Sequence, residues 1–142
     1  ITASDTHELR RRVLRDDNPT ATLDWPGDHD VTTFHLGVRD TDGNVLATST
    51  WLARPDPDRP DVPATQLRGM ATEPAHAGTG LGSALLTAGA ARCRERGDAV
   101  LWANARFGAL DFYERAGFRI VGPVFTTADT GLPHRRVRLE LD

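Results

Sequence analysis

Three glycines alternate along the segment Ala77-Gly78-Thr79-Gly80-Leu81-Gly82, which joins an expected strand to an expected helix. Glycines at such a junction let the backbone approach a ligand closely, and the N–H groups of the first helical turn have no partner within the helix. The helix dipole adds positive potential at the same end. This spacing predicts a phosphate or diphosphate site, with a tight turn that binds nothing as the alternative.

Two nucleotide-binding loops also carry closely spaced glycines, but they fit this sequence less well. A dinucleotide-binding Rossmann loop has a further glycine at the position of Ser83 and follows its strand directly. Here Glu73-Pro74-Ala75-His76 intervenes. A Walker loop contains Gly-Lys-Ser/Thr, and the chain has no lysine. The expected phosphate therefore belongs to another kind of ligand.

The elements that must position this loop follow from the residue pattern. We expect helices over residues 7–15, 81–96 and 107–116, the first capped by Ser4 or Asp5 and the second ended by Gly97. We expect strands over residues 31–39, 45–52, 65–72, 99–103, 118–125 and 136–141, with Asp42-Gly43 turning the first hairpin. This order predicts a mixed α/β fold in a single domain, residues 1–142.

Composition excludes several classes of protein. A net charge of −3 gives no overall attraction to nucleic acid or to an anionic membrane. No apolar run approaches the ~20 residues that cross a bilayer, and the first residues lack the pattern of a secretory signal. A single cysteine, Cys93, excludes a disulfide framework and a cysteine-rich metal site. We therefore expect a cytoplasmic protein with no bound metal, no nucleic-acid partner and no membrane partner, and we interpret Arg10-Arg11-Arg12 as a solvated helix face.

Two motifs in succession resemble those of the GNAT acetyltransferase superfamily. Gln66 to Pro74 followed by Ala77 to Gly82 is similar to the cofactor motif. Asn104 followed by residues 109–118 resembles the strand–helix pair that ends in Phe-Tyr-x-x-x-Gly-Phe, with Tyr113 as its tyrosine. The resemblance is specific over Gln66 to Gly122. It implies a mixed, mostly antiparallel central sheet flanked by helices, and an N-acetyltransferase that moves an acetyl group from acetyl-CoA, its co-substrate, directly to an amine.

The resemblance also assigns roles to residues. The backbone of Met70, Ala71 and Thr72 and the side chain of Asn104 hold the pantetheine arm, and the diphosphate lies on the loop Ala77, Gly78, Thr79, Gly80, Leu81, Gly82 and Ser83. Tyr113 is the general acid, because a phenol of pKa ~10 stays neutral at pH 7 and can donate to a thiolate of pKa ~8.5. Ala77 departs from the Arg or Gln usual in the family, which removes a charge-assisted contact of ~1–2 kcal/mol.

Other roles stay open at the level of sequence. Glu73, His35, His134 and Asp111 are candidates for the general base, while Gln66 can orient water but cannot take a proton. We expect Cys93 to be no nucleophile. We expect core packing rather than a substrate cleft for Trp25, Trp51 and Trp102.

Two other functions compete with acetyl transfer, namely a module that binds CoA or acyl-CoA without transferring it and a nucleotide-binding regulator. The acidic residues between Asp16 and Asp61 favour a cationic acceptor only weakly, because acidic loops usually serve solubility. The acceptor itself is a small-molecule amine or an exposed amino group. The oligomeric state is open at the level of sequence, with a homodimer as one possibility because two-fold dimers are the commonest assembly.

Overall fold

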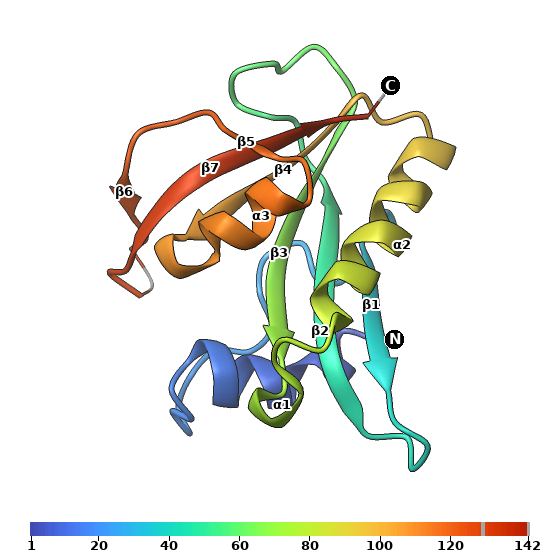
Figure 1. The fold of residues 1–142 in the computed structure, drawn as a ribbon, viewed down its shortest axis with the longest axis vertical. Coiled ribbons are helices and arrows are strands. Elements are labelled where there is room, and N and C mark those ends of the chain that lie inside the picture. The colour runs from blue at the N-terminus through green and yellow to red at the C-terminus, as the bar shows by residue number, and fades with distance from the viewer. Residues whose placement is uncertain (129, 142) are drawn as a thin grey trace. The chain divides into compact units, whose positions relative to one another are not determined.

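A computed structural model describes residues 1–128 and 130–141 (Figure 1). The chain divides into two compact units. Unit 1 contains Ile1–Leu52 and Arg68–Gly89, and unit 2 contains Ala53–Leu67 and Ala90–Asp142. The described strands form a seven-stranded sheet in the order β1-β2-β3-β4-β7-β5, and β6 also pairs with β7. None of the helices in the described ranges is long and apolar enough to span a membrane.

Unit 1 begins with a continuous helical segment followed by a hairpin. The segment consists of a 3-10 turn over Ser4–Thr6, α1 over His7–Leu9 and a π-helical stretch over Arg10–Leu14. The hairpin joins β1, Phe34–Arg39, to β2, Val45–Ala53, which run antiparallel with Phe34 opposite Trp51. Then come β3 over Ala64–Thr72, a 3-10 turn over Pro74–His76 and α2 over Leu81–Glu95, with β3 and α2 each crossing the boundary between the units.

Unit 2 is built around β7, Pro133–Glu140. Its other elements are β4 over Val100–Arg106, a 3-10 turn over Phe107–Ala109, α3 over Leu110–Arg115, β5 over Arg119–Ile120 and β6 over Phe125–Thr126. β4, β5 and β6 each pair antiparallel with β7, whereas the start of β3 pairs parallel with β4. The expectation of a mixed, mostly antiparallel sheet with helices around it is therefore confirmed.

Four predicted strands differ from the structure by more than one residue, and one of them, predicted over residues 99–103, is found over Val100–Arg106. The first strand begins at Phe34, because the Thr33 N–H donates to the Asp30 carbonyl at 3.0 Å and closes a turn that leaves Val31 fully exposed. The single strand predicted over residues 118–125 is two short strands. Pro123, which has no N–H to donate to a ladder, lies between them. The last strand begins at Pro133 rather than at residue 136.

The cap of the first helix lies further back than the predicted Ser4 or Asp5. Asp5 Oδ2 accepts from the Thr2 N–H at 2.9 Å, and Thr2 Oγ1 accepts from the Asp5 N–H at 3.3 Å. This reciprocal pair has the geometry of a capping box, with an aspartate in place of the usual Glu or Gln. Two backbone donors are satisfied at once, which explains why the helical segment already includes Ser4.

The interpretation of Arg10-Arg11-Arg12 as a solvated face is wrong for Arg10, whose side chain is fully buried. Its guanidinium donates to both carboxylate oxygens of Asp28, at 2.5 and 3.1 Å, and to Thr50 Oγ1 at 2.8 Å. It also stacks 3.8 Å from the ring centre of Trp25. The loop after the first helix therefore folds back over this arginine. The ring of Trp25 thus covers the guanidinium of a buried ion pair.

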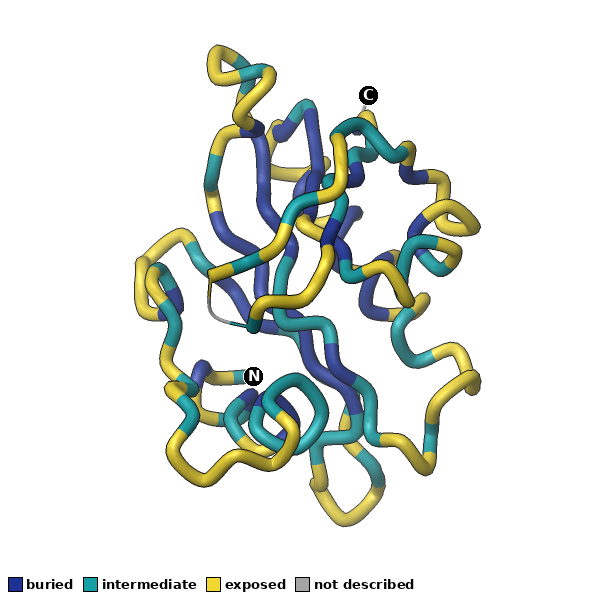
Figure 2. Tube along the Cα trace, turned by 90° about the vertical axis from the view of Figure 1, so that its left-hand side faces the viewer, coloured by how far each residue is buried: buried dark blue, intermediate teal, exposed yellow. Residues whose placement is uncertain are grey.

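The hydrophobic core of unit 1 is centred on Trp51, which is completely buried on β2. Its ring stacks on Phe34 with 5.6 Å between centroids, and its Nε1 donates to Ser49 Oγ at 2.8 Å. Trp102 is buried in unit 2 and donates to the Arg54 carbonyl at 3.0 Å. Core packing for Trp51 and Trp102 is confirmed, and Figure 2 shows the buried stretches as dark blue runs along the strands.

Gly89 on α2 is required by the packing of Trp51. A Cβ added at residue 89 would lie 2.0 Å from Cζ2 of Trp51. Alanine favours a helix by about 1 kcal/mol over glycine, but overpacking a core costs about 1–3 kcal/mol and this contact is unusually short. We expect Gly89→Ala to lower the free energy of unfolding by about 2 kcal/mol in urea titrations. Gly108→Ala, where a Cβ meets nothing within 4 Å, is the control, and equal urea midpoints for the two variants would contradict this packing.

Candidate active site

The glycine loop of unit 1 is exposed and held by short local hydrogen bonds. The Ala77 N–H donates to the Pro74 carbonyl at 3.2 Å, and Thr79 Oγ1 donates to the His76 carbonyl at 2.5 Å. Gly78 and Gly80 adopt backbone φ values of +76° and +90°, which residues other than glycine rarely adopt. Gly82 does not share this conformation, because it already lies within α2.

The start of α2 leaves several backbone donors available beside this loop. The first turn closes when the Ala84 N–H donates to the Gly80 carbonyl at 3.0 Å, so the N–H groups of Leu81, Gly82 and Ser83 have no acceptor within the helix. The first turn carries no acidic residue, so no carboxylate competes for these donors. A Cβ at Gly78 or Gly80 would meet nothing within 4 Å, which leaves the space open. These features fit a diphosphate.

The conformation of Gly80 allows a direct test of the loop. Gly80→Ala introduces backbone strain without a steric clash, at a cost of about 1–3 kcal/mol. We expect the strained loop to shift and weaken CoA binding by about tenfold in calorimetry, with a loss of stability as well. Gly43→Ala is the matched control, because Gly43 has φ +86° and equally open surroundings in the hairpin turn. It should lose similar stability and keep its CoA affinity, and the same drop in affinity for both variants would contradict the prediction.

The last residues of β3 have backbone N–H and C=O groups that lie outside the described pairs with β4. The β3–β4 ladder runs from Ala64 opposite Val100 to Leu67 opposite Ala103. Gly69 follows with φ +65°, which bends the strand. Met70, Ala71 and Thr72 lie beyond this bend, in unit 1 and outside the described β3–β4 pairs. Their backbone groups on that edge suit hydrogen bonding to an extended amide-containing ligand.

Glu73 ties this region to the first helix through an ion pair that sequence analysis missed. Arg12 donates to its two carboxylate oxygens at 3.1 and 2.5 Å, across 61 positions of sequence. The hydrogen bonds from Arg12 hold the pKa of Glu73 below its usual range, which makes this carboxylate a poor base. Its structural role is to anchor the residue that precedes the Pro74–His76 turn.

Asn104 and Tyr113 lie in unit 2. Asn104 is the one exposed residue of β4, and its side chain makes no hydrogen bond to any residue of 1–128 or 130–141. The alternative interpretation, a side chain satisfying local backbone, is therefore not supported. Tyr113 is buried on α3, with its ring edge-to-face against Phe112 at 5.3 Å and Phe118 at 5.1 Å. Burial raises the pKa of Tyr113, so the phenol is neutral at pH 7.

The structure separates the remaining candidates for proton transfer. His35 is buried with both ring nitrogens engaged, Nδ1 with Thr50 Oγ1 at 2.8 Å and Nε2 with the Asp28 carbonyl at 3.0 Å. Asp111 is exposed on α3. Gln66 Oε1 accepts a hydrogen bond from Arg54 at 3.3 Å. Of the four candidate bases, Glu73 and His35 are therefore occupied by structural contacts, whereas His134 in unit 2 has one ring nitrogen engaged, Nδ1 with the Leu132 carbonyl at 2.8 Å.

Cys93 is fully buried in unit 2. Burial raises the pKa of its thiol, and the charge of Asp98 acts in the same direction. A buried, protonated thiol is a poor nucleophile. The structure therefore agrees with the expectation that Cys93 takes no part in the chemistry.

Residues 3–118 match the acetyltransferase (GNAT) family, and the chain belongs to this family. It is 30% identical over 131 residues to the N-acetyltransferase YitI of Bacillus subtilis (strain 168), itself described as uncharacterized, covering 92% of this chain and 87% of that one. The protein is thus an acyltransferase whose family uses acetyl-CoA as co-substrate.

Solved structures have the same fold. An acyl-CoA N-acyltransferase from Pseudomonas aeruginosa superposes with a TM-score of 0.74 at 25% identity, over 95% of this chain and 87% of that chain. An aminoglycoside 6'-N-acetyltransferase complexed with coenzyme A superposes with a TM-score of 0.78 at 12% identity, over 99% and 91%.

Proposed function

We propose that residues 1–142 act as one N-acetyltransferase domain, which transfers the acetyl group of acetyl-CoA directly to an amine of a small molecule or to an exposed amino group. The observation that carries this proposal is the exposed loop at residues 77–83, where unpaired N–H groups and positive helix potential meet in open space. Membership of the GNAT family supports acetyl transfer from acetyl-CoA as the reaction at that site.

Each group of residues has a role in this proposal. Ala77 to Ser83 form the loop that binds the diphosphate, with the N–H groups of Leu81, Gly82 and Ser83 as donors. The backbone of Met70, Ala71 and Thr72 and the amide of Asn104 hold the pantetheine arm. The acceptor nitrogen attacks the thioester carbonyl, so that an N–C bond forms and the C–S bond breaks. Tyr113, kept neutral by burial, gives its proton to the departing thiolate.

A binding module that holds CoA without transfer is the competing function, and Ala77 favours it because the loop lacks a cationic side chain at that position. An assay of free thiol released from acetyl-CoA in the presence of an amine panel separates the two. We expect thiol release that depends on the amine, with one acetylated amine formed per thiol. Stabilisation by CoA of about 2.7 kcal/mol at 100 times the dissociation constant, with no thiol release on any amine, would favour the module instead.

The charge of the acceptor is not indicated by the acidic loops. Three of these carboxylates accept hydrogen bonds from arginine side chains: Asp28 from Arg10, Asp56 from Arg138 at 2.6 Å, and Asp58 from Arg136 at 3.1 Å. Several of the carboxylates between Asp16 and Asp61 thus serve internal ion pairs. A neutral amine panel is therefore as suitable a starting point as a polycationic one.

A further inference from the structure

We propose that His134 is the general base, and that its Nε2 takes the proton from the ammonium group of the acceptor. This inference rests on the proposed function, and it supplies the one chemical role that the family resemblance leaves open. Three observations carry it: the tautomer of the ring, the freedom of Nε2, and the position of His134 on the sheet of unit 2.

A backbone hydrogen bond determines which ring nitrogen is basic. His134 Nδ1 lies 2.8 Å from the Leu132 carbonyl oxygen. A carbonyl only accepts, so Nδ1 carries the hydrogen and the neutral ring has its lone pair on Nε2. The ring also stacks on Phe125, with 5.8 Å between centroids and 27° between planes. The imidazole is therefore held in one orientation with its basic nitrogen directed away from Leu132.

No residue within 1–128 or 130–141 makes a hydrogen bond to His134 Nε2. Nε2 is therefore available to a ligand's hydrogen bond, although the residue as a whole is largely buried. His35, with both nitrogens engaged, shows what a structural histidine in this chain looks like.

The strand register places His134 beside the proposed pantetheine contact. On β7, His134 lies opposite Arg106 and Arg136 lies opposite Asn104. Opposite residues share a face of a sheet, as do residues two apart on one strand. His134 and Asn104 therefore lie on the same face of unit 2, two positions apart along the ladder, with the Ala105–Arg135 pair between them.

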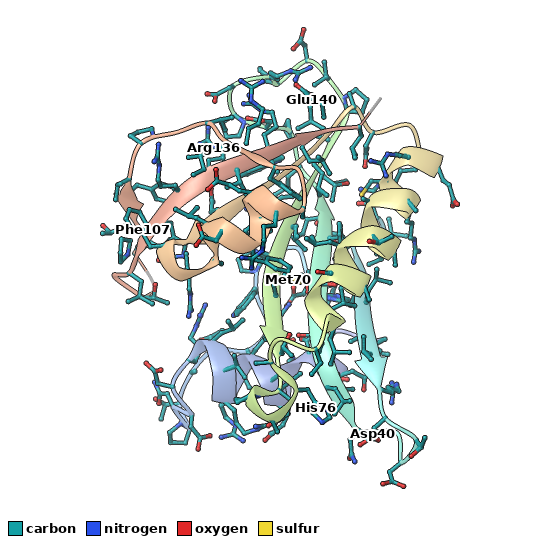
Figure 3. The ribbon with its side chains drawn as sticks, in the orientation of Figure 1. Asp40, Met70, His76, Phe107, Arg136 and Glu140 are labelled. Atoms are coloured by element: carbon teal, nitrogen blue, oxygen red, sulfur yellow. The ribbon has the colours of Figure 1, made fainter. Side chains whose placement is uncertain are left out.

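This end of β7 is also open to an acceptor. Phe107, which follows β4 and is labelled in Figure 3, is 47% exposed, and Leu132 is 42% exposed. The other charged side chains on this face of β4 and β7 are those of Arg106, Arg136, Arg138 and Glu140. Glu140 is the one carboxylate among them; it lies at the far end of β7 and is paired with Arg59.

The proton balance of the reaction is complete with this assignment. His134 Nε2 takes one proton from the ammonium, and the neutral amine then forms the N–C bond as the C–S bond breaks. Tyr113 protonates the thiolate, and the second nitrogen proton, released as the amide forms, restores the phenol directly or through water. Protonated His134 finally returns its proton to solvent. No oxidant, metal or additional reactant is needed.

The test compares two amines at one pH. His134→Asn keeps a nitrogen donor for the Leu132 carbonyl but has no basic nitrogen. For a simple alkyl amine, whose ammonium pKa is ~10, we expect kcat/KM to fall about 10²-fold. For trifluoroethylamine, which is already neutral at the assay pH and needs no base, the fall should stay within about threefold. The dissociation constant of acetyl-CoA should not change, and His29→Asn, at an exposed histidine, should match wild type with both amines.

Two outcomes would overturn the assignment: equal losses with both amines, or no loss with the alkyl amine. Wild-type protein that acetylates neither amine would instead overturn the proposed function, so the two failures are distinguishable. A measurement on wild-type protein remains decisive if the variant does not fold. Long-range ¹H–¹⁵N NMR of the imidazoles should find the His134 hydrogen on Nδ1, and a hydrogen on Nε2 in the neutral ring would contradict the proposal.

Discussion

Replacing Tyr113 with phenylalanine is expected to lower kcat about 10²-fold, because removing a positioned acid typically costs 10²–10⁴-fold. The lower end applies, since water can protonate a thiolate of pKa ~8.5 in part. The ring stays between Phe112 and Phe118, so the free energy of unfolding should change by less than about 0.5 kcal/mol. Thiol release under saturating acetyl-CoA and amine measures kcat, and calorimetry should show the same affinity for CoA.

The control for Tyr113→Phe is a variant that damages the packing but leaves the hydroxyl. Phe118→Leu removes the edge-to-face partner at 5.1 Å and should lower stability by about 1–2 kcal/mol. Its kcat should remain within a few-fold of wild type at temperatures where it is folded. If Tyr113→Phe retained full turnover, or if Phe118→Leu lost as much as Tyr113→Phe, the assignment of the acid would be wrong.

Replacing Arg10 with methionine is expected to destabilise unit 1 more than any surface change. Both side chains of the Arg10–Asp28 pair are completely buried, and the variant leaves the Asp28 carboxylate with only the longer contact to Arg68, at 3.4 Å. Breaking a buried pair by removing one partner typically costs about 3–5 kcal/mol. Trp25 would also lose the guanidinium that lies 3.8 Å from its ring centre. Urea unfolding at pH 7 measures the loss.

The pH dependence of this loss has a definite sign. Burial alone would raise the pKa of Asp28, but hydrogen bonds from Arg10 and from the Trp25 amide, with the charge of Arg10, lower it overall. A lowered folded-state pKa contributes stability above the unfolded value, near 3.9, which is lost as the pH falls through the folded value. The gap between wild type and Arg10→Met should therefore narrow below about pH 4.

Two variants complete this prediction. Arg11→Met removes a partially exposed arginine whose partner Glu8 is largely exposed, and it should cost less than about 1 kcal/mol. Asp28→Asn combined with Arg10→Met removes the stranded charge and should recover part of the loss. An Arg10→Met protein as stable as Arg11→Met would contradict the description of a buried, mutually dependent pair.

The parts of the site that sequence could predict are those whose chemistry lies in consecutive residues. The loop at Gly78 and Gly80 and the motif around Tyr113 combine residue type with position between elements; the loop directly precedes α2, and Tyr113 lies on α3. The β-hairpin around Asp42-Gly43 can also be predicted from the sequence, because Gly43 adopts the positive φ that the turn needs.

The parts that sequence could not predict depend on chain segments that meet only after folding. Asp28 reaches Arg10 across 18 positions, and Glu73 reaches Arg12 across 61. Nothing in an arginine-rich helical pattern shows which arginine will be covered by a later loop. The tautomer of His134 likewise depends on a backbone carbonyl that faces the ring only in the folded hairpin. Such contacts require the tertiary structure.

Amide NMR of ¹⁵N-labelled protein during a titration with coenzyme A would show directly whether main-chain N–H groups at residues 78–83 bind its diphosphate. We predict saturable shifts of the Gly78, Gly80 and Gly82 amides, reproduced by CoA but absent with S-acetylpantetheine, which lacks the diphosphate. Unchanged glycine amides at millimolar CoA, or equal shifts with the compound that carries no phosphate, would contradict the proposed mode of binding and the acetyltransferase site built on it.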